Sequence, residues 1–145
     1  MQSLQSKLSI DSSVLIAYLL GEKSGEVAGK QIFQPGRVLL FNRLGLAEVF
    51  YTLCRKNGVS FAKESVTTFI QTNYCTFEDS HDLALEAGTY KCGRAISLAD
   101  CYVIALAKLT GSTAVFAKRE KEIVLEMGRK RFDVPIIFLE DFAKS

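Results

Sequence analysis

Short apolar runs alternate along the chain with longer segments in which apolar residues recur at helical spacing. The runs at 8–10, 37–41, 113–116 and 134–139 have the length of strands, and such unbroken apolar runs are typical of a parallel sheet covered on both faces. Residues 74–77 predict a short edge strand. The intervening segments predict helices at 14–20, around 27–33, and at 44–56, 60–72, 80–94, 95–111 and 117–127. This order predicts the α/β class, as a three-layer α/β/α sandwich with a mainly parallel central sheet.

Length and composition narrow the class of protein. The 145 residues are 48% hydrophobic and 23% charged, which indicates a single globular domain over 1–145. The apolar runs are far shorter than the ~20 residues of a membrane span, and the first residues lack the apolar core of a signal peptide, so we expect a cytoplasmic protein without membrane association. Four cysteines without a C-x-x-C pair, and a single histidine, His81, argue against a zinc site and for free thiols.

Charge gives only a weak indication of partners. The net charge of +2 is too small to diagnose a nucleic-acid-binding protein. Basic residues are concentrated between 118 and 131, yet glutamates interrupt them, and a mixed run of this kind is more often a solvated helix face than a phosphate-binding surface.

Three carboxylates stand out because their surroundings are apolar. Asp11 follows the first predicted strand, Glu48 is the only charge of its helix before Arg55, and Asp100 lies in the first turn of a helix that is apolar almost all round. Each has a structural alternative. Asp11 is competent as an N-cap, Glu48 as a polar-face residue, and Asp100 as part of a capping box with Ser97.

The functional interpretation is a metal site at the sheet edge. Ligands of open α/β sheets bind at the carboxyl ends of the strands, where Asp11 is expected. Clustered carboxylates that no lysine neutralises need protonation or a cation, and Mg²⁺ or Mn²⁺ prefers such oxygen ligands. The acids therefore favour a metal-assisted phosphodiester hydrolase.

The sequence resembles the PIN-domain family, and in particular the VapC-type toxin ribonucleases of prokaryotic, including archaeal, toxin–antitoxin systems. The similarity is carried by IDSSVLIAYLLGE at 10–22, LAEVFYTLCRKNG at 46–58, ISLADCYVIALAKLTGSTAVFAKREKEI at 96–123 and PIIFLEDF at 135–142. The resemblance implies a PIN fold, with Asp11, Glu48 and Asp100 as the catalytic and metal-binding acids. It also implies dependence on Mg²⁺ or Mn²⁺, an RNA substrate, a small antitoxin and a homodimer, with Ser12 supporting the metal site.

The chain departs from the family where a further acid usually follows the fourth strand. Lys118 occupies that place, and Glu120, or less favourably Glu122, is the candidate replacement. Three acids still suffice for one metal, whereas a second metal is doubtful. Lys118, Arg119 and Lys121 are candidate contacts to RNA.

Two functions therefore remain open. The first is a metal-dependent endoribonuclease that uses a metal-activated water. The second is a catalytically weakened PIN-like module that binds RNA or protein without cutting, and Lys118 is the feature in its favour. A nucleotide- or flavin-binding domain ranks below both because no glycine fingerprint is present.

Overall fold

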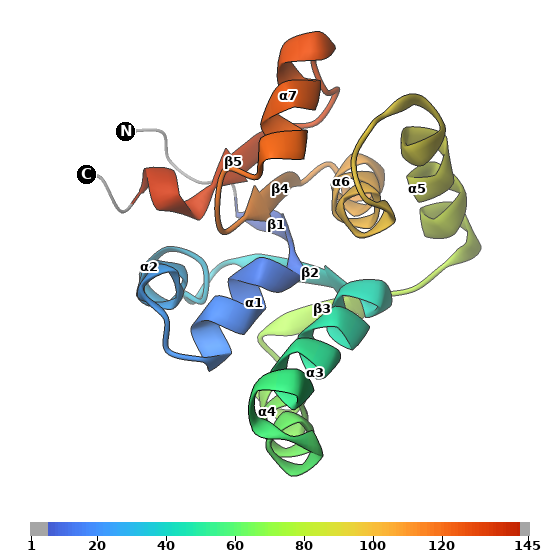
Figure 1. Ribbon diagram of the computed structural model, residues 1–145. Coiled ribbons are helices and arrows are strands. Elements are labelled where there is room, and N and C mark those ends of the chain that lie inside the picture. Colours follow the sequence, from blue (N-terminus) through green and yellow to red (C-terminus); the bar gives the residue numbers. More distant parts are fainter. Residues whose placement is uncertain (1–5, 143–145) are drawn as a thin grey trace.

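A computed structural model describes residues 6–142 and shows one parallel five-stranded sheet (Figure 1). Ser9 lies opposite Leu40 on one side and Ala114 on the other, so the carboxyl ends of the three central strands meet at one edge. The strands have the spatial order β3-β2-β1-β4-β5 and comprise β1 (Lys7–Ile10), β2 (Val38–Asn42), β3 (Cys75–Glu78), β4 (Thr113–Phe116) and β5 (Ile136–Phe138).

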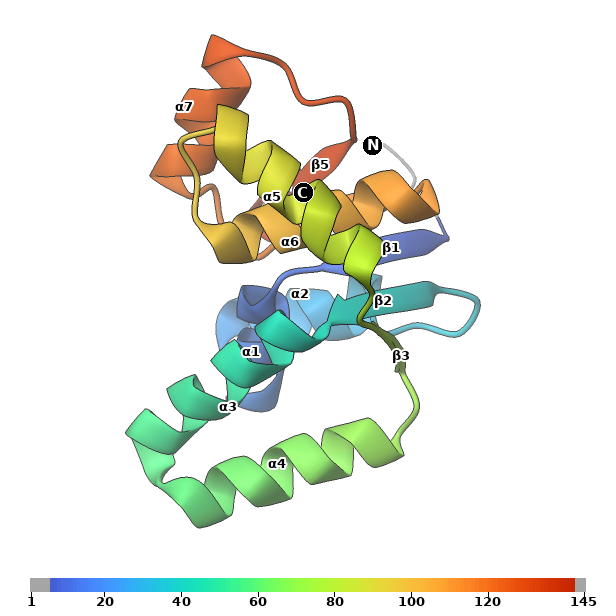
Figure 2. The ribbon, with the colours of Figure 1, turned by 90° about the vertical axis from the view of Figure 1, so that its right-hand side faces the viewer.

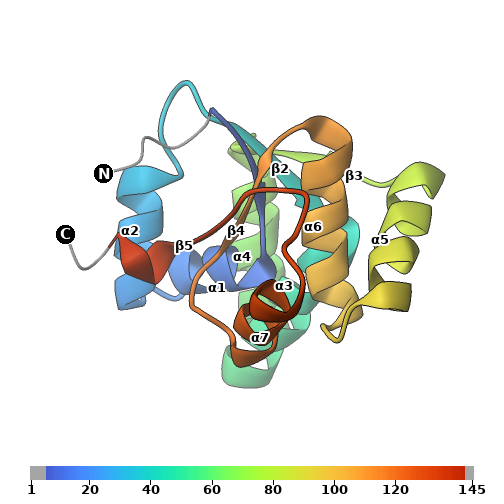
Figure 3. The same ribbon diagram turned by 90° about the horizontal axis from the view of Figure 1, so that it is seen from above.

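Helices cover both faces of the sheet, which confirms the predicted three-layer α/β/α sandwich. One layer contains α1 (Ser12–Leu19), α2 (Lys23–Gln31), α3 (Arg43–Asn57) and α4 (Val59–Gln71). The other contains α5 (His81–Gly93), α6 (Leu98–Thr110) and α7 (Lys121–Arg129), and a 3₁₀ turn, η1 (Leu139–Asp141), follows β5. Figure 3 shows that α6 packs next to the sheet and that α5 lies outside α6.

The alternation of side chains along the strands builds two hydrophobic cores. Ile10, Phe41 and Val115 point into the core formed with α1 to α4. Leu40 and Phe116, one position away, point into the core formed with α5 to α7. Because both faces are covered, β2 and β4 carry apolar residues on both of their faces, as the unbroken runs predicted.

The last predicted helix begins four residues later than the pattern indicated. Residues 117–120 form a loop, because the Ala117 amide donates to Ser13 Oγ at 3.1 Å and the Ala117 carbonyl accepts from the Glu140 amide at 3.0 Å. These bonds hold the chain against α1 and η1 before α7 starts at Lys121. The loop thereby keeps Glu120 near the carboxyl edge of the sheet.

Other element boundaries also differ from the prediction. Helix α2 starts at Lys23 instead of near 27, where Gly25 lets it lie directly against α1: a Cβ on Gly25 would fall 2.1 Å from the Ala17 carbonyl oxygen. Helix α6 begins at Leu98, because Ser97 is its N-cap, and the last strand is confined to Ile136–Phe138. The first two predicted strands and the edge strand at 75–78 are present.

The helices and the cysteines can be compared with the expectations from composition. No helix within residues 6–142 is both long and apolar enough to cross a membrane. All four cysteines are free, and Cys75 and Cys101 are buried, in agreement with the prediction of free thiols.

Candidate active site

Asp11 lies where β1 ends and α1 begins. Its backbone amide donates to the Val115 carbonyl at 2.9 Å, which ties it to the neighbouring strand β4. Its side chain is the N-cap of α1, because Oδ2 accepts from the Ser13 amide at 3.0 Å. Asp11 is nevertheless only 4% exposed, and this burial raises the pKa of its carboxyl group, although hydrogen bonds from Ser13 and Ser12 oppose the shift. The capping and functional interpretations of Asp11 are therefore compatible.

Glu48 is brought to Asp11 by the packing of α3 on α1. Ser12 Oγ donates to Glu48 Oε1 at 3.2 Å, so the hydroxyl predicted to support the site does contact one of the acids. Burial, followed by the negative charge of Asp11, raises the pKa of Glu48. Leu44 and Tyr51, four residues before and three residues after Glu48 on the same helix, are both exposed. Helix α3 instead buries its other face, and Glu48 is half-buried by α1.

The start of α3 is fixed by two residues that sequence reasoning did not single out. Asn42, the last residue of β2, caps the helix: its Oδ1 accepts from the Gly45 amide at 2.7 Å. Gly45 allows the helix to approach the strand, since a Cβ there would lie 2.9 Å from the Phe41 ring. Within the described part of the chain, Asn42 Nδ2 is buried and has no hydrogen-bond partner. The signal in the sequence was a cap-forming residue directly before a helix.

Asp100 enters the cluster from the opposite layer. Ser97 caps α6, with its Oγ accepting from the Asp100 amide at 3.1 Å, so this half of the predicted capping box is confirmed. Asp100 as a whole is buried, with only 8% of its surface exposed. Its pKa is raised to about 6, mainly by burial and then by the charge of Asp11, with smaller contributions from Glu48 and Glu122.

A fourth acid, Glu120, completes the cluster. It is half-buried at the end of the loop that follows β4 and directly precedes α7. Burial raises its pKa to about 7, and the charges of Asp100, Asp11, Glu122 and Glu48 all act in the same direction. The negative charge of Asp11 thus raises the pKa of the other three acids, so the four carboxyl groups lie near one another although they come from the β1–α1 junction, α3, α6 and the β4–α7 loop.

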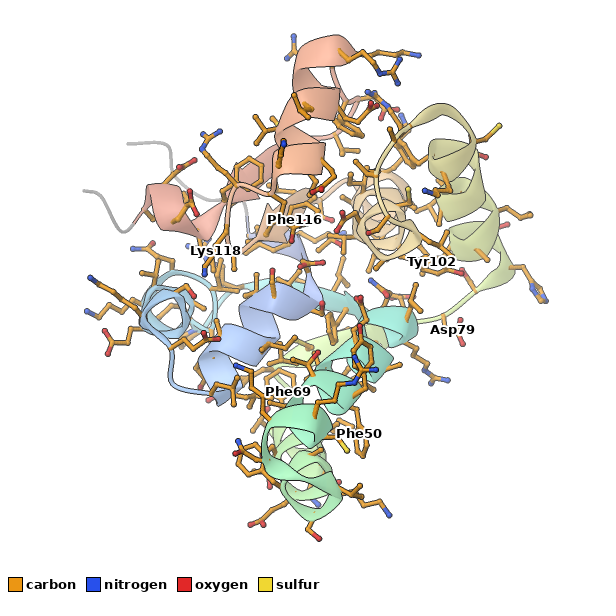
Figure 4. The ribbon with its side chains drawn as sticks, in the orientation of Figure 1. Phe50, Phe69, Asp79, Tyr102, Phe116 and Lys118 are labelled. Carbon is orange, nitrogen blue, oxygen red and sulfur yellow. The ribbon has the colours of Figure 1, made fainter. Side chains whose placement is uncertain are left out.

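The basic residues of the same loop lie outside the cluster. Lys118 is exposed, and Figure 4 places it on the side of α2, whereas Tyr102 of α6 lies on the other side of the loop. Arg119 is engaged by Asp141, with Nε–Oδ1 and Nη2–Oδ2 distances of 3.0 and 2.8 Å. Lys121 is exposed at the first position of α7. None of the ion pairs between described residues involves the four acids.

The donor chemistry of the cluster fits a hard divalent cation. All its donors are carboxylate oxygens, supported by serine hydroxyls, and the single histidine lies elsewhere at the start of α5. Within residues 6–142, however, no three His, Cys, Asp or Glu side chains are grouped closely enough to hold a metal ion as they stand. The acids converge on one region of the sheet edge without forming a closed set of ligands.

The acids lie at the carboxyl edge of a parallel sheet, which is where open α/β domains bind their ligands. The sequence profile of the PIN domain matches residues 8–121, so the chain belongs to the PIN-domain family. A search of curated protein sequences finds no match.

Solved structures with a similar fold include a VapC toxin and toxin–antitoxin complexes. VapC20 from Mycobacterium tuberculosis, described as a toxin that cleaves the sarcin-ricin loop, is 18% identical, with a TM-score of 0.66 over 83% of this chain and 94% of VapC20. A toxin–antitoxin complex from Klebsiella pneumoniae is 16% identical, with a TM-score of 0.65 over 92% and 98% of the two chains. VapBC-1 from nontypeable Haemophilus influenzae is 15% identical, with the same TM-score and coverage. At these identities the likeness establishes the fold.

Proposed function

We propose that this protein is a metal-dependent endoribonuclease and the toxin of a toxin–antitoxin pair. The observation that carries the proposal is the convergence of Asp11, Glu48, Asp100 and Glu120: burial raises the pKa of all four, and the charges of other acids in the group further raise the pKa of Glu48, Asp100 and Glu120. Keeping uncompensated carboxylates together opposes folding at neutral pH unless a ligand offsets their repulsion. A cation is the ligand that this chemistry selects.

Asp11, Glu48 and Asp100 are the proposed metal ligands, and Glu120 the supporting fourth acid. Bound Mg²⁺ or Mn²⁺ would supply Lewis-acid polarisation of the phosphodiester and an activated water. Ser12 orients Glu48 through its hydroxyl, and Ser13 orients Asp11 through its amide. Ser13 Oγ also holds the Ala117 amide and thereby the loop that carries Glu120. The two serines thus connect three of the four acids.

The proposed partners follow from the structural relatives. Several are described as VapBC or toxin–antitoxin complexes, and two of these complexes are bound to DNA. We therefore propose a small antitoxin protein as the partner of this chain, a homodimer as its assembly, and the cytoplasm as its location. RNA is the proposed substrate.

The decisive experiment is a ribonuclease assay on structured and unstructured RNA with titration of Mg²⁺ and Mn²⁺. We expect cleavage that a chelator abolishes, and a loss of at least about 100-fold in rate for Asp100→Asn. Asp82→Asn is the matched control, because Asp82 is also a first-turn helix acid but is exposed on α5, outside the cluster. The control variant should cleave RNA at the wild-type rate.

Each result has a definite meaning. Cleavage that survives both the chelator and Asp100→Asn would eliminate the proposal. Metal-dependent binding of RNA without cleavage by the wild-type protein would instead favour the alternative of a PIN-like binding module. In either case circular dichroism of Asp100→Asn must match the wild type, because removal of a raised-pKa acid is not expected to unfold the domain.

A further inference from the structure

A basic cleft lies between the end of α5 and the segment that follows α7. Its volume is about 290 Å³, and it is lined by Thr89, Tyr90, Gly93, Arg94, Lys130, Arg131 and Asp133. None of these residues belongs to the acid cluster. The cleft contains part of the basic stretch between 118 and 131, which the proposed reaction does not use.

Arg94 fixes the shape of the cleft. Its guanidinium donates to the carbonyl oxygens of Lys130 and Arg131, the latter at 2.9 Å, and stacks on the Phe132 ring at 3.8 Å from the centroid. The same guanidinium lies 3.7 Å from the buried carboxylate of Glu126. These contacts hold the backbone of residues 130–132 against the end of α5, so the two neighbouring side chains start from a fixed position.

Lys130 and Arg131 carry positive charge that no acid compensates. Both are exposed, and their side chains form no ion pair or hydrogen bond with any described residue. The acids beside them are already engaged: Asp133 pairs with Lys108 at 2.8 Å, and Glu126 accepts two hydrogen bonds from Arg129. The charge of the two residues is therefore available to an anionic ligand.

Two elements connect the cleft directly to the acid cluster. Residues 94–97 lead from Arg94 to Ser97, the cap of α6, and Lys91 Nζ holds this segment through the Ile96 carbonyl at 2.7 Å. Helix α7 starts beside Glu120 and ends at Arg129, whose Nη2 donates to the Gly93 carbonyl at 2.9 Å. Figure 2 shows the α5–α6 loop beside α7. The cleft and Glu120 thus lie near opposite ends of α7, a helix of nine residues.

We propose that this cleft binds two backbone phosphates of the RNA substrate outside the acid cluster, one through Lys130 and one through Arg131. The inference rests on the proposed ribonuclease function and adds to it the surface that supplies affinity. Clustered carboxylates repel a polyanion, so attraction must come from cations beyond them. The unpaired side chains of Lys130 and Arg131, held next to a rigid backbone, provide this attraction.

The test is the double variant Lys130→Gln/Arg131→Gln, with Lys56→Gln/Lys63→Gln as the matched control. Lys56 and Lys63 are exposed near the α3–α4 turn, so the control removes the same charge far from the cleft. All proteins carry Asp100→Asn to prevent cutting, and binding of a fluorescent single-stranded RNA of about 20 nucleotides is followed by anisotropy over a range of salt concentrations.

We expect the cleft variant to bind RNA about tenfold more weakly than the control at low salt. The slope of log K against log salt should fall by about 1.4, which is the loss of two single-strand phosphate contacts. When the cleft variant is made in the protein that retains Asp100, its KM for long RNA should rise with kcat unchanged. A dinucleotide substrate should be cleaved by this variant as by the wild type. Unchanged melting temperatures of both variants verify that the exposed substitutions leave the fold intact.

RNA affinity and salt slope equal to those of the control would overturn the inference. So would a loss confined to duplex DNA of the same length, since the cleft would then serve a different polyanion. If the wild type cuts RNA but the cleft variant behaves as the control, only the inference fails. If no metal supports cutting while the cleft variant still loses RNA binding, the proposed catalytic function fails and the binding surface stands.

Discussion

At the scale of single residues, the loop after β4 determines which side chain completes the cluster. The resemblance to the PIN family aligns Lys118 with the usual place of the further acid, and Glu120, or less favourably Glu122, is the candidate replacement. In the structure Lys118 is exposed, and Glu120 is close enough to Asp100, Asp11 and Glu48 for their charges to raise its pKa. Glu120 precedes the buried Ile123 by three residues, so the start of α7 directs it inward while Ile123 packs into the core.

We therefore expect Glu120→Gln to reduce metal-dependent cleavage by about 10- to 100-fold, the effect of losing a supporting group. Glu22→Gln is the matched control, because Glu22 also precedes a helix without capping it but is exposed at α2. Lys118→Ala should leave kcat unchanged. The measurement is single-turnover cleavage under saturating metal, and a larger loss from Lys118→Ala than from Glu120→Gln would contradict the assignment.

These residues also mark how far sequence reasoning reached. Asp11, Glu48 and Asp100 were identified because a charge in an apolar segment is conspicuous, and all three lie at one edge of the sheet. The sequence named Glu120 as the candidate fourth acid but could not place it, since its position depends on the hydrogen bond from the Ala117 amide to Ser13, 104 residues apart in sequence. The periodicity of apolar residues predicts local secondary structure and carries no information about such a long-range contact.

At the scale of elements, the cluster depends on how each helix begins. Three of the helices are capped by Asp11, Asn42 and Ser97, each at the carboxyl edge of the sheet, and each cap orients a helix that supplies or supports an acid. The sequence indicated the strands and most helices because their apolar patterns are strong. It misjudged the start of α7 and the extent of α2, where long-range bonds and the close approach of Gly25 to α1 override local propensity.

Asn42 offers a test at this scale. Asn42→Ala removes the cap of α3 and should cost about 1 kcal/mol of unfolding free energy, which lowers Tm by about 2–4 °C in a chain of this size. Asn42→Ser keeps an acceptor for the Gly45 amide and removes the buried Nδ2 that has no partner, so it should lie close to the wild type. Thermal unfolding followed by circular dichroism measures both.

A contrary order, with the serine variant less stable than the alanine variant, would show that Asn42 contributes through its amide donor and not as a cap. Since α3 carries Glu48, the alanine variant should also weaken stabilisation of the protein by Mn²⁺ more than the serine variant does. The ratio of the two metal-induced shifts therefore separates capping of the helix from placement of its acid.

At the scale of the whole molecule, two hydrophobic cores hold the sheet between helices, and the acids occupy the edge where both cores end. Burial of apolar side chains in these two cores thus offsets the repulsion between the carboxylates at the edge. This arrangement has a measurable consequence for the dependence of stability on pH. The pKa of Asp100 is raised to about 6 and that of Glu120 to about 7, above the values of 3.8 and 4.5 that these groups have when unperturbed.

A raised carboxyl pKa means that the folded protein retains protons which the unfolded chain has already released. The free energy of unfolding should therefore fall as pH rises from about 4 to about 7, by on the order of 2 kcal/mol for the two groups together once solvent screening is allowed for. Groups with a lowered pKa, such as Asp133, make the free energy of unfolding rise with pH, but they do so below about pH 4. Asp100→Asn/Glu120→Gln should flatten the dependence.

Binding of Mn²⁺ should reverse this loss, because a cation competes with protons for the same carboxylates. With millimolar Mn²⁺ the rise in Tm should be several degrees at about pH 8 and much smaller at about pH 5, and it should vanish in Asp100→Asn/Glu120→Gln. Ca²⁺, which accepts the same oxygen ligands, serves as a check that the shift follows carboxylate coordination. An equal shift at both pH values, or one that persists in the double variant, would place the cation elsewhere on the protein and leave the four acids without the role proposed for them.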